Sequence, residues 1–269
     1  MVRALIIATA LLAGFQQLFA DEVKFAGKGW EVLVVKPDTY NPRSKYRVVY
    51  ILPTTVPKDG QGVRVFQDLK IPNLYNVIVV TMAFDITPWY ADNATDAKVR
   101  QESYIRDGVV AYIESKYSTL GTPEGRILIG FGKSGWGAFS LILRNPNFFG
   151  YAVSWDAPLM LDRFDPSDDH QMEAVFGSQD QLNAYRPDLL VPQKKDAFKD
   201  KSRLVLGGGT LYGTYLSPRG DDQTAAFHQL LDANGIKHTY LSHIQAAHSW
   251  NSIWVKPALQ ALLANPVNP

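Results

Sequence analysis

Residues 126–143, RILIGFGKSGWGAFSLIL, decide the fold of this chain. A short apolar run at 127–129 predicts a buried strand, and the stretch at 138–143 has the length and spacing of a helix. A cluster of glycine and serine separates the two. Strand, sharp glycine turn and helix is the arrangement of a nucleophile elbow, in which a strained turn holds a catalytic side chain above the edge of a sheet.

The elbow fits this sequence in two registers. In the first, Gly130 ends the strand, Phe131 follows, and Gly132 takes the nucleophile position although it has no side chain to react. In the second, Ser134 takes that position, with Trp136 where the motif ends on glycine. A serine before an apolar helix is also a common N-terminal cap. From the residues alone, Ser134 is therefore either a nucleophile or a cap.

The first twenty residues have the pattern of an export signal. Arg3 supplies a positive charge, 4–15 are almost all apolar, and Ala20 precedes an acidic pair. This run is short for a membrane span, and no later segment qualifies. We expect a signal peptide at 1–20, a single domain at 21–269, a periplasmic or extracellular location, and no membrane association after cleavage.

Composition limits the function classes. A chain of 269 residues with 46% hydrophobic residues suits one domain with a full core, and a net charge of +1 gives no reason to expect nucleic acid as a partner. The absence of cysteine excludes a thiolate nucleophile and a cysteine-based zinc site. One acidic cluster has a spacing that matches no metal-ligand pattern, so we expect no metal there: it comprises Asp165, Asp168, Asp169 and His170.

Strands alternate with helices along the rest of the chain. We expect strands at 30–35, 46–52, 77–83, 127–129, 151–155, 203–206 and 238–244, and helices at 96–117, after Ser134, at 223–233 and at 253–264. This alternation predicts an α/β fold with a mainly parallel sheet and helices on both faces. Ligands bind such sheets at the carboxyl ends of the strands.

Several candidate site residues follow these strands. Thr54 lies where a backbone donor of an oxyanion hole is expected. Trp89 and Tyr90, in an aromatic loop, and Trp155, at a strand end, are candidates for a substrate platform or for packing. Asp156 follows Trp155 and either shapes the same cleft or caps the strand.

A histidine and an acidic pair complete the set. Asp221 and Asp222 precede a helix, where one of them is expected to cap and the other to orient a histidine. His248 lies in the loop after the last strand, where a hydrolase needs its general base, and the order of elbow, acid and histidine is that of the α/β-hydrolase fold. We expect a structural role for the other histidines: His170, His228, His238 and His243.

From about residue 46 to 254 the chain resembles the putative esterase family of α/β-hydrolases, which includes S-formylglutathione hydrolases, feruloyl and other carbohydrate esterases, and mycolyltransferases. The elbow carries the resemblance, together with the segments 148–150, 220–223 and 248–250. The resemblance implies an acyl or carbohydrate ester as substrate and no cofactor. It further implies Asp222 as the triad acid, the backbone N–H of Lys133 as an oxyanion donor, and Gly132 where the nucleophilic serine belongs.

Three hypotheses follow. The chain is an exported esterase in which Ser134 attacks, His248 transfers the proton and Asp222 holds the imidazole. Alternatively it is a catalytically silent homologue that binds an acylated or sugar ligand. In the third hypothesis, water activated by His248 attacks the ester directly.

Overall fold

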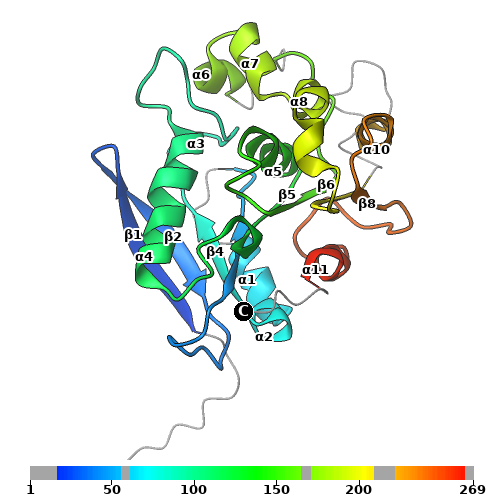
Figure 1. Ribbon diagram of the computed structural model, residues 1–269. Coiled ribbons are helices and arrows are strands. Elements are labelled where there is room, and N and C mark those ends of the chain that lie inside the picture. Colours follow the sequence, from blue (N-terminus) through cyan, green and yellow to red (C-terminus); the bar gives the residue numbers. More distant parts are fainter. Residues whose placement is uncertain (1–16, 56–60, 165–170, 209–221, 264–269) are drawn as a thin grey trace, which may run out of the picture.

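The computed structural model describes residues 17–55, 61–164, 171–208 and 222–263. Within them an eight-stranded sheet runs in the order β1-β2-β4-β3-β5-β6-β7-β8 (Figure 1). The strands β3 to β8 pair in parallel, whereas β1 and β2 pair antiparallel with their neighbours. The prediction of a mainly parallel α/β sheet is confirmed. The strands are β1 (Leu18–Phe25), β2 (Lys28–Val35), β3 (Arg47–Ile51), β4 (Val77–Met82), β5 (Arg126–Phe131), β6 (Tyr151–Trp155), β7 (Leu204–Gly207) and β8 (His238–Leu241).

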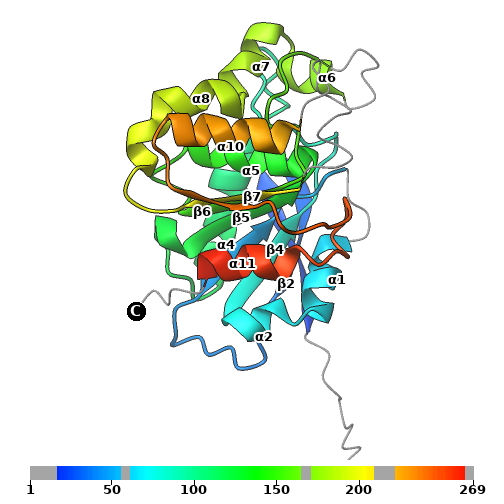
Figure 2. The ribbon, with the colours of Figure 1, turned by 90° about the vertical axis from the view of Figure 1, so that its right-hand side faces the viewer.

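Helices cover both faces of the sheet. Figure 2 shows α5, α8 and α10 above it and α1 and α11 below it. The helical segments are α1 (Gln61–Asp68), α2 (Ile71–Tyr75), α3 (Gln101–Ser103), the π-helix η1 (Tyr104–Val110), α4 (Ala111–Lys116), the 3₁₀ turns η2 (Pro123–Gly125) and η3 (Lys195–Phe198), α5 (Lys133–Arg144), α6 (Met172–Phe176), α7 (Gln179–Tyr185), α8 (Pro187–Lys194), α10 (Gln223–Ala233) and α11 (Val255–Leu263).

The central strands are buried on both faces, which explains why their sequences are continuous apolar runs. Every residue of β4 is buried. Ile78 and Val80 belong to the hydrophobic cluster that also contains residues of α5 and α10, whereas Val77 and Val79 belong to the cluster with residues of α11. Alternate residues of a strand point to opposite faces, so one apolar run supplies both layers of the core.

The amino-terminal strand departs from the sequence prediction. Leu18, Phe19 and Ala20 belong to β1 and pair with Val35, Val34 and Leu33 of β2. The expected cleavage point after Ala20 therefore falls inside a strand. Most of the expected signal segment, residues 1–16, lies outside the described residues.

The helix expected at 96–117 begins later and is not uniform. It comprises α3, the π-helix η1 and α4, with Gly108 in the π segment. The sequence does not predict the short helices α1, α2, α6, α7 and α8. The helix at 223–233 has the expected bounds as α10, and the last strand ends earlier than expected, at Leu241.

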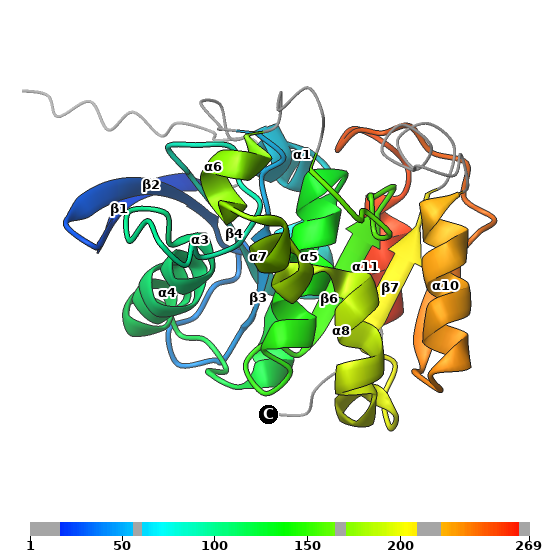
Figure 3. The same ribbon diagram turned by 90° about the horizontal axis from the view of Figure 1, so that it is seen from above.

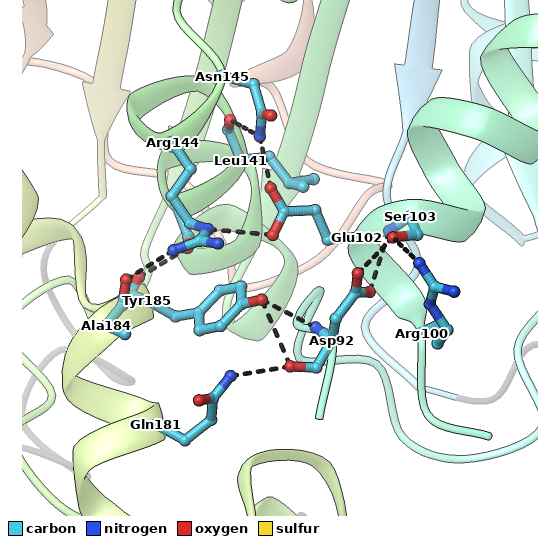
Figure 4. A network of polar contacts seen from close by, with 11 residues as sticks. Asp92, Arg100, Glu102, Ser103, Leu141, Arg144, Asn145, Gln181, Ala184 and Tyr185 are labelled. Carbon is cyan, nitrogen blue, oxygen red and sulfur yellow. Dashed lines mark hydrogen bonds and ion pairs between the residues drawn. The ribbon is translucent and has the colours of Figure 1, made fainter. Parts of the chain in front are cut away.

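A polar network joins α3, the end of α5 and α7 (Figure 4). Glu102 accepts hydrogen bonds from Nε of Arg144 at 3.0 Å and from Nδ2 of Asn145 at 2.6 Å. Nη1 of Arg144 also donates to the carbonyl of Ala184 at 2.9 Å. Because Glu102 is buried and paired, these contacts fix the helix that leaves the elbow.

None of the helices in the described ranges combines the length and the apolar character needed to cross a bilayer.

Candidate active site

The elbow at the end of β5 has a backbone that only glycine adopts easily. Gly132 has φ 55° and ψ −131°, and its N–H donates to the carbonyl of Trp155 at 2.9 Å. Helix α5 begins at the next residue, Lys133. At Gly130 a Cβ atom would lie 2.2 Å from backbone atoms of Ser134, because the helix turns back across the strand. The expected strand, glycine turn and helix are all present, and Gly132 stands at the apex.

His248 faces Gly132. A Cβ atom built on Gly132 would lie 2.9 Å from both Cε1 and Nε2 of this imidazole. The rings of His248 and Phe131 pack in a T-shaped arrangement, with 4.8 Å between their centroids. The histidine predicted from its place after the last strand therefore stands over the nucleophile position of the first register.

Asp156 holds the imidazole from the other side. Its Oδ2 lies 2.8 Å from Nδ1 of His248, and the two side chains are 3% and 20% exposed. A carboxylate oxygen only accepts, so Nδ1 carries the proton and the lone pair of the neutral ring is on Nε2, toward Gly132. Asp156 has φ 44°, a backbone conformation that is rare for residues other than glycine. Among the described residues, its Oδ1 is buried without a hydrogen-bond partner.

The structure corrects the assignment of Asp222 as the residue that orients His248. Asp222 is the N-cap of α10, and its Oδ1 accepts from the N–H of Thr224 at 2.9 Å and of Ala225 at 3.3 Å. Burial raises the pKa of Asp222, two backbone N–H groups lower it, and the negative charge of Asp156 raises it further. The capping alternative thus describes Asp222, whereas Asp221 lies outside the described residues.

Ser134 is not placed to attack a substrate. It is fully buried as the second residue of α5. Its hydroxyl accepts from the N–H of Phe131 at 3.0 Å and donates to the carbonyl of Phe131 at 2.9 Å. The single proton of this hydroxyl is donated to the backbone, and the side chain has no exposed surface. The hydroxyl therefore lacks the access to substrate that a nucleophile needs. The N-cap of the helix is Gly132, so Ser134 ties the strand end to the helix without being the cap itself.

The expected oxyanion donors lie on neighbouring segments. Lys133 opens α5, so its N–H belongs to the first turn, where backbone donors have no partner within the helix. Thr54 follows β3 and is half-buried. The residue before it, Pro53, accepts a hydrogen bond from the hydroxyl of Tyr90. Tyr90 therefore anchors the loop that carries Thr54.

The expected aromatic platform does not line a cleft. Trp89, Tyr90 and Trp155 are all 0% exposed. Trp89 packs edge-on against Trp136 with 5.4 Å between centroids, and Trp155 stacks on Trp254 at 5.2 Å. Large aromatic side chains gain most by burial, so these three support the site from within and do not contact a ligand.

Asp156 is the residue whose role the sequence analysis missed. Two signals pointed to it: it directly follows a buried parallel strand, and it lies beside the end of the elbow strand once β5 and β6 are paired. The pairing of β6 with both β5 and β7 brings its carboxyl end into the middle of the site, and strand order cannot be read from spacing along the chain.

Comparisons with known proteins agree with this architecture. The ferulic acid esterase structure superposes with a TM-score of 0.73 at 17% identity, over 93% of this chain and 98% of that chain. An S-formylglutathione hydrolase from Agrobacterium tumefaciens gives 0.74 at 14% identity, over 93% and 94%. FphF, a fluorophosphonate-binding serine hydrolase of Staphylococcus aureus, gives 0.73 at 16% identity, over 94% and 100%. A search of curated proteins gave no significant match.

Identities this low show a shared fold and do not transfer an activity. The family is shown by a different finding, a match of the sequence model described as Putative esterase to residues 26–264. Since that match spans most of the chain, the protein belongs to the Putative esterase family, with the α/β-hydrolase fold.

Proposed function

We propose that this protein hydrolyses a small carboxylic ester by direct attack of water, with His248 as general base and no covalent intermediate. Membership of the esterase family supports ester chemistry. The observation that carries the water mechanism is the paired imidazole: Nδ1 of His248 bonds Asp156 at 2.8 Å, and Nε2 faces the side-chain position of Gly132.

The proton movements follow from this geometry. Nε2 of His248 takes a proton from a water molecule, whose oxygen attacks the acyl carbon. The carbonyl oxygen of the ester becomes an oxyanion, which the N–H of Lys133 and the Thr54 loop are placed to stabilise. The imidazolium then gives its proton to the leaving alcohol as the tetrahedral intermediate collapses to the acid. Asp156 keeps the ring in the required tautomer throughout.

We expect this reaction to be slow. In serine hydrolases, losing the nucleophile removes most of the rate, and what remains comes from binding and the oxyanion hole. A carbohydrate ester is one candidate within this substrate class, which a panel of aryl, alkyl and sugar acetates would resolve.

A second candidate function, binding of an ester without turnover, is favoured by the tight approach at the elbow. The 2.9 Å separation between His248 and the Cβ position of Gly132 is closer than real Cβ atoms come to other side chains. The imidazole therefore reaches into the volume that a serine side chain would need. If it also excludes water, the site binds an ester and leaves it intact.

Steady-state hydrolysis of p-nitrophenyl acetate separates these functions. We expect the wild type to show slow turnover above background without an initial burst, because no acyl-enzyme accumulates. His248→Gln should reduce the rate to background, whereas His243→Gln, which changes an exposed histidine, should leave it unchanged. Equal rates for wild type and His248→Gln would refute the water mechanism. If the ester binds the wild type without turnover, the second function holds.

We also propose that the chain is exported, on the support of the charge, apolar run and small-residue end of residues 1–20. Cleavage after Ala20 would shorten β1 by its first residues, Leu18 to Ala20. The intact mass of protein recovered from the periplasm or medium gives the cleavage point, and recovery of the full-length chain from the cytoplasm alone would contradict export.

A further inference from the structure

Two histidines and an aspartate meet where α10 ends and β8 begins. His228 and Asp232 lie one turn apart on α10, and His238 is the first residue of β8. In Figure 3, α10 runs from the carboxyl ends of the strands, where the active site lies, toward their amino ends. This His228–Asp232–His238 cluster is therefore separate from the His248–Asp156 pair, which follows the carboxyl ends of the strands.

The hydrogen bonds fix where the lone pairs of the cluster point. Nδ1 of His238 lies 2.8 Å from the carbonyl oxygen of Ile236, which only accepts, so in a neutral His238 Nδ1 carries the proton and Nε2 carries a lone pair. In that tautomer Nδ1 of His228, 2.7 Å away, donates to Nε2 of His238. In a neutral His228 the remaining nitrogen, Nε2, then presents a lone pair toward Oδ2 of Asp232 at 3.5 Å. A lone pair that faces a carboxylate is an arrangement that either a proton or a metal ion between the two satisfies.

We propose that the cation is a divalent transition-metal ion, with Zn²⁺ as the representative occupant. Two imidazole nitrogens and one carboxylate oxygen suit Zn²⁺, whereas Mg²⁺ and Ca²⁺ prefer oxygen ligands alone. One ligand atom from each of the three side chains lies within 4.8 Å of the others. Nothing in the ester mechanism requires this ion.

The distances to Asp232 need only small adjustments, whereas the ring of His228 must turn so that its Nδ1–H no longer faces Nε2 of His238. Bonds of about 2.0–2.1 Å in a tetrahedral zinc site place ligand atoms roughly 3.4 Å apart. Nε2 of His228 is 3.5 Å from Oδ2 of Asp232, and Nε2 of His238 is 4.0 Å from Oδ1. On binding, the ion takes the lone pair of His238 to which His228 now donates. The side chains of His228 and Asp232 are 30% and 61% exposed, so both have room to shift.

The surroundings hold His238 in place and leave the site open to solvent. The His238 side chain is only 4% exposed, and its bond to the carbonyl of Ile236 is the outer contact that ligating histidines typically make. Tyr240 stacks on His228 with 4.4 Å between centroids. Together with Lys237 these residues line a surface depression through which an ion can enter. A bound ion would link α10 to β8 and stabilise the folded chain.

Calorimetric titration of the full chain, without a histidine tag, with ZnCl₂ tests the site. We expect one ion per chain for the wild type, with binding weakened at least about tenfold by His228→Ala and by Asp232→Asn. Saturating Zn²⁺ should raise the melting temperature of the wild type and not that of the His228→Ala variant. His243→Ala, which removes an exposed histidine elsewhere, is the matched control and should bind as the wild type does.

Histidine side-chain NMR of the wild type adds a measurement that needs no variant. Zn²⁺ should shift the ring nitrogen signals of His228 and His238 and leave those of His243 in place. If the cluster holds only a proton, Zn²⁺ will change neither these signals nor the melting temperature, and the proposal is wrong. Unchanged affinity in His228→Ala would likewise overturn it.

Discussion

Asp156 and Asp222 differ in what they contact, and this difference assigns their roles. Asp156 bonds the imidazole, whereas Asp222 bonds the first turn of α10. Asp156→Asn should therefore reduce hydrolysis by orders of magnitude, because an amide N–H₂ facing Nδ1 favours the wrong tautomer. Asp222→Asn should leave hydrolysis nearly unchanged, since asparagine is an equally good N-cap. The reverse pattern in kcat/KM would restore Asp222 as the triad acid.

The same pair makes a pH-dependent prediction about stability. The pKa of Asp222 is raised above its ordinary value of 3.8, chiefly by burial and also by the charge of Asp156. The folded chain therefore holds this proton more tightly than the unfolded chain, and the resulting stability is lost as pH rises through the folded pKa. Asp222→Asn should melt higher than the wild type at pH 7, and the difference should vanish as pH falls below 3.8. A lower melting temperature at pH 7 would contradict this.

At the scale of the element, the elbow depends on Ser134 for structure. Ser134→Ala would leave the buried N–H and carbonyl of Phe131 without this side-chain partner, at a cost of about 1–3 kcal/mol. Urea unfolding measures that cost. Ser140→Ala is a matched control on the same helix, since its buried hydroxyl donates to the carbonyl of Tyr185 away from the elbow. Both variants should keep the wild-type rate of hydrolysis. Loss of activity in Ser134→Ala alone, in a folded protein, would identify Ser134 as the nucleophile.

At the scale of the whole molecule, the sequence predicts the elements that have a clear periodic pattern. It does not predict which residues the order of the strands brings together. The parallel strands were visible because burial on both faces produces apolar runs, as in β4. The strand at 30–35 was expected and corresponds to β2, whereas β1 was missed because residues 18–20 were interpreted as the end of an export signal. The short helices α6, α7 and α8 span 5, 7 and 8 residues, too few for a periodic pattern to stand out.

In the candidate site, too, some residues could be identified from the sequence, and the role of others depends on the fold. His248 was singled out by its place in the chain order, whereas the residues left Gly132 and Ser134 as alternative positions in the elbow. In the structure, His248 faces Gly132 and Ser134 is buried. The role of Asp156 was missed because it depends on β6 lying between β5 and β7. The buried state of Trp89, Tyr90 and Trp155 was left open, since an aromatic loop has the same composition whether it packs inward or lines a cleft.

The central claim is that the site has a base and its partner but no serine nucleophile. A fluorophosphonate probe tests this directly, because a reactive serine displaces fluoride and forms a stable Oγ–P bond. Intact-mass spectrometry should show the wild type unlabelled and Gly132→Ser labelled once, at residue 132, with the imidazole of His248 displaced to admit the side chain. The double change Gly132→Ser with His248→Gln should label far more slowly. Labelling of the wild type at Ser134 would contradict the account.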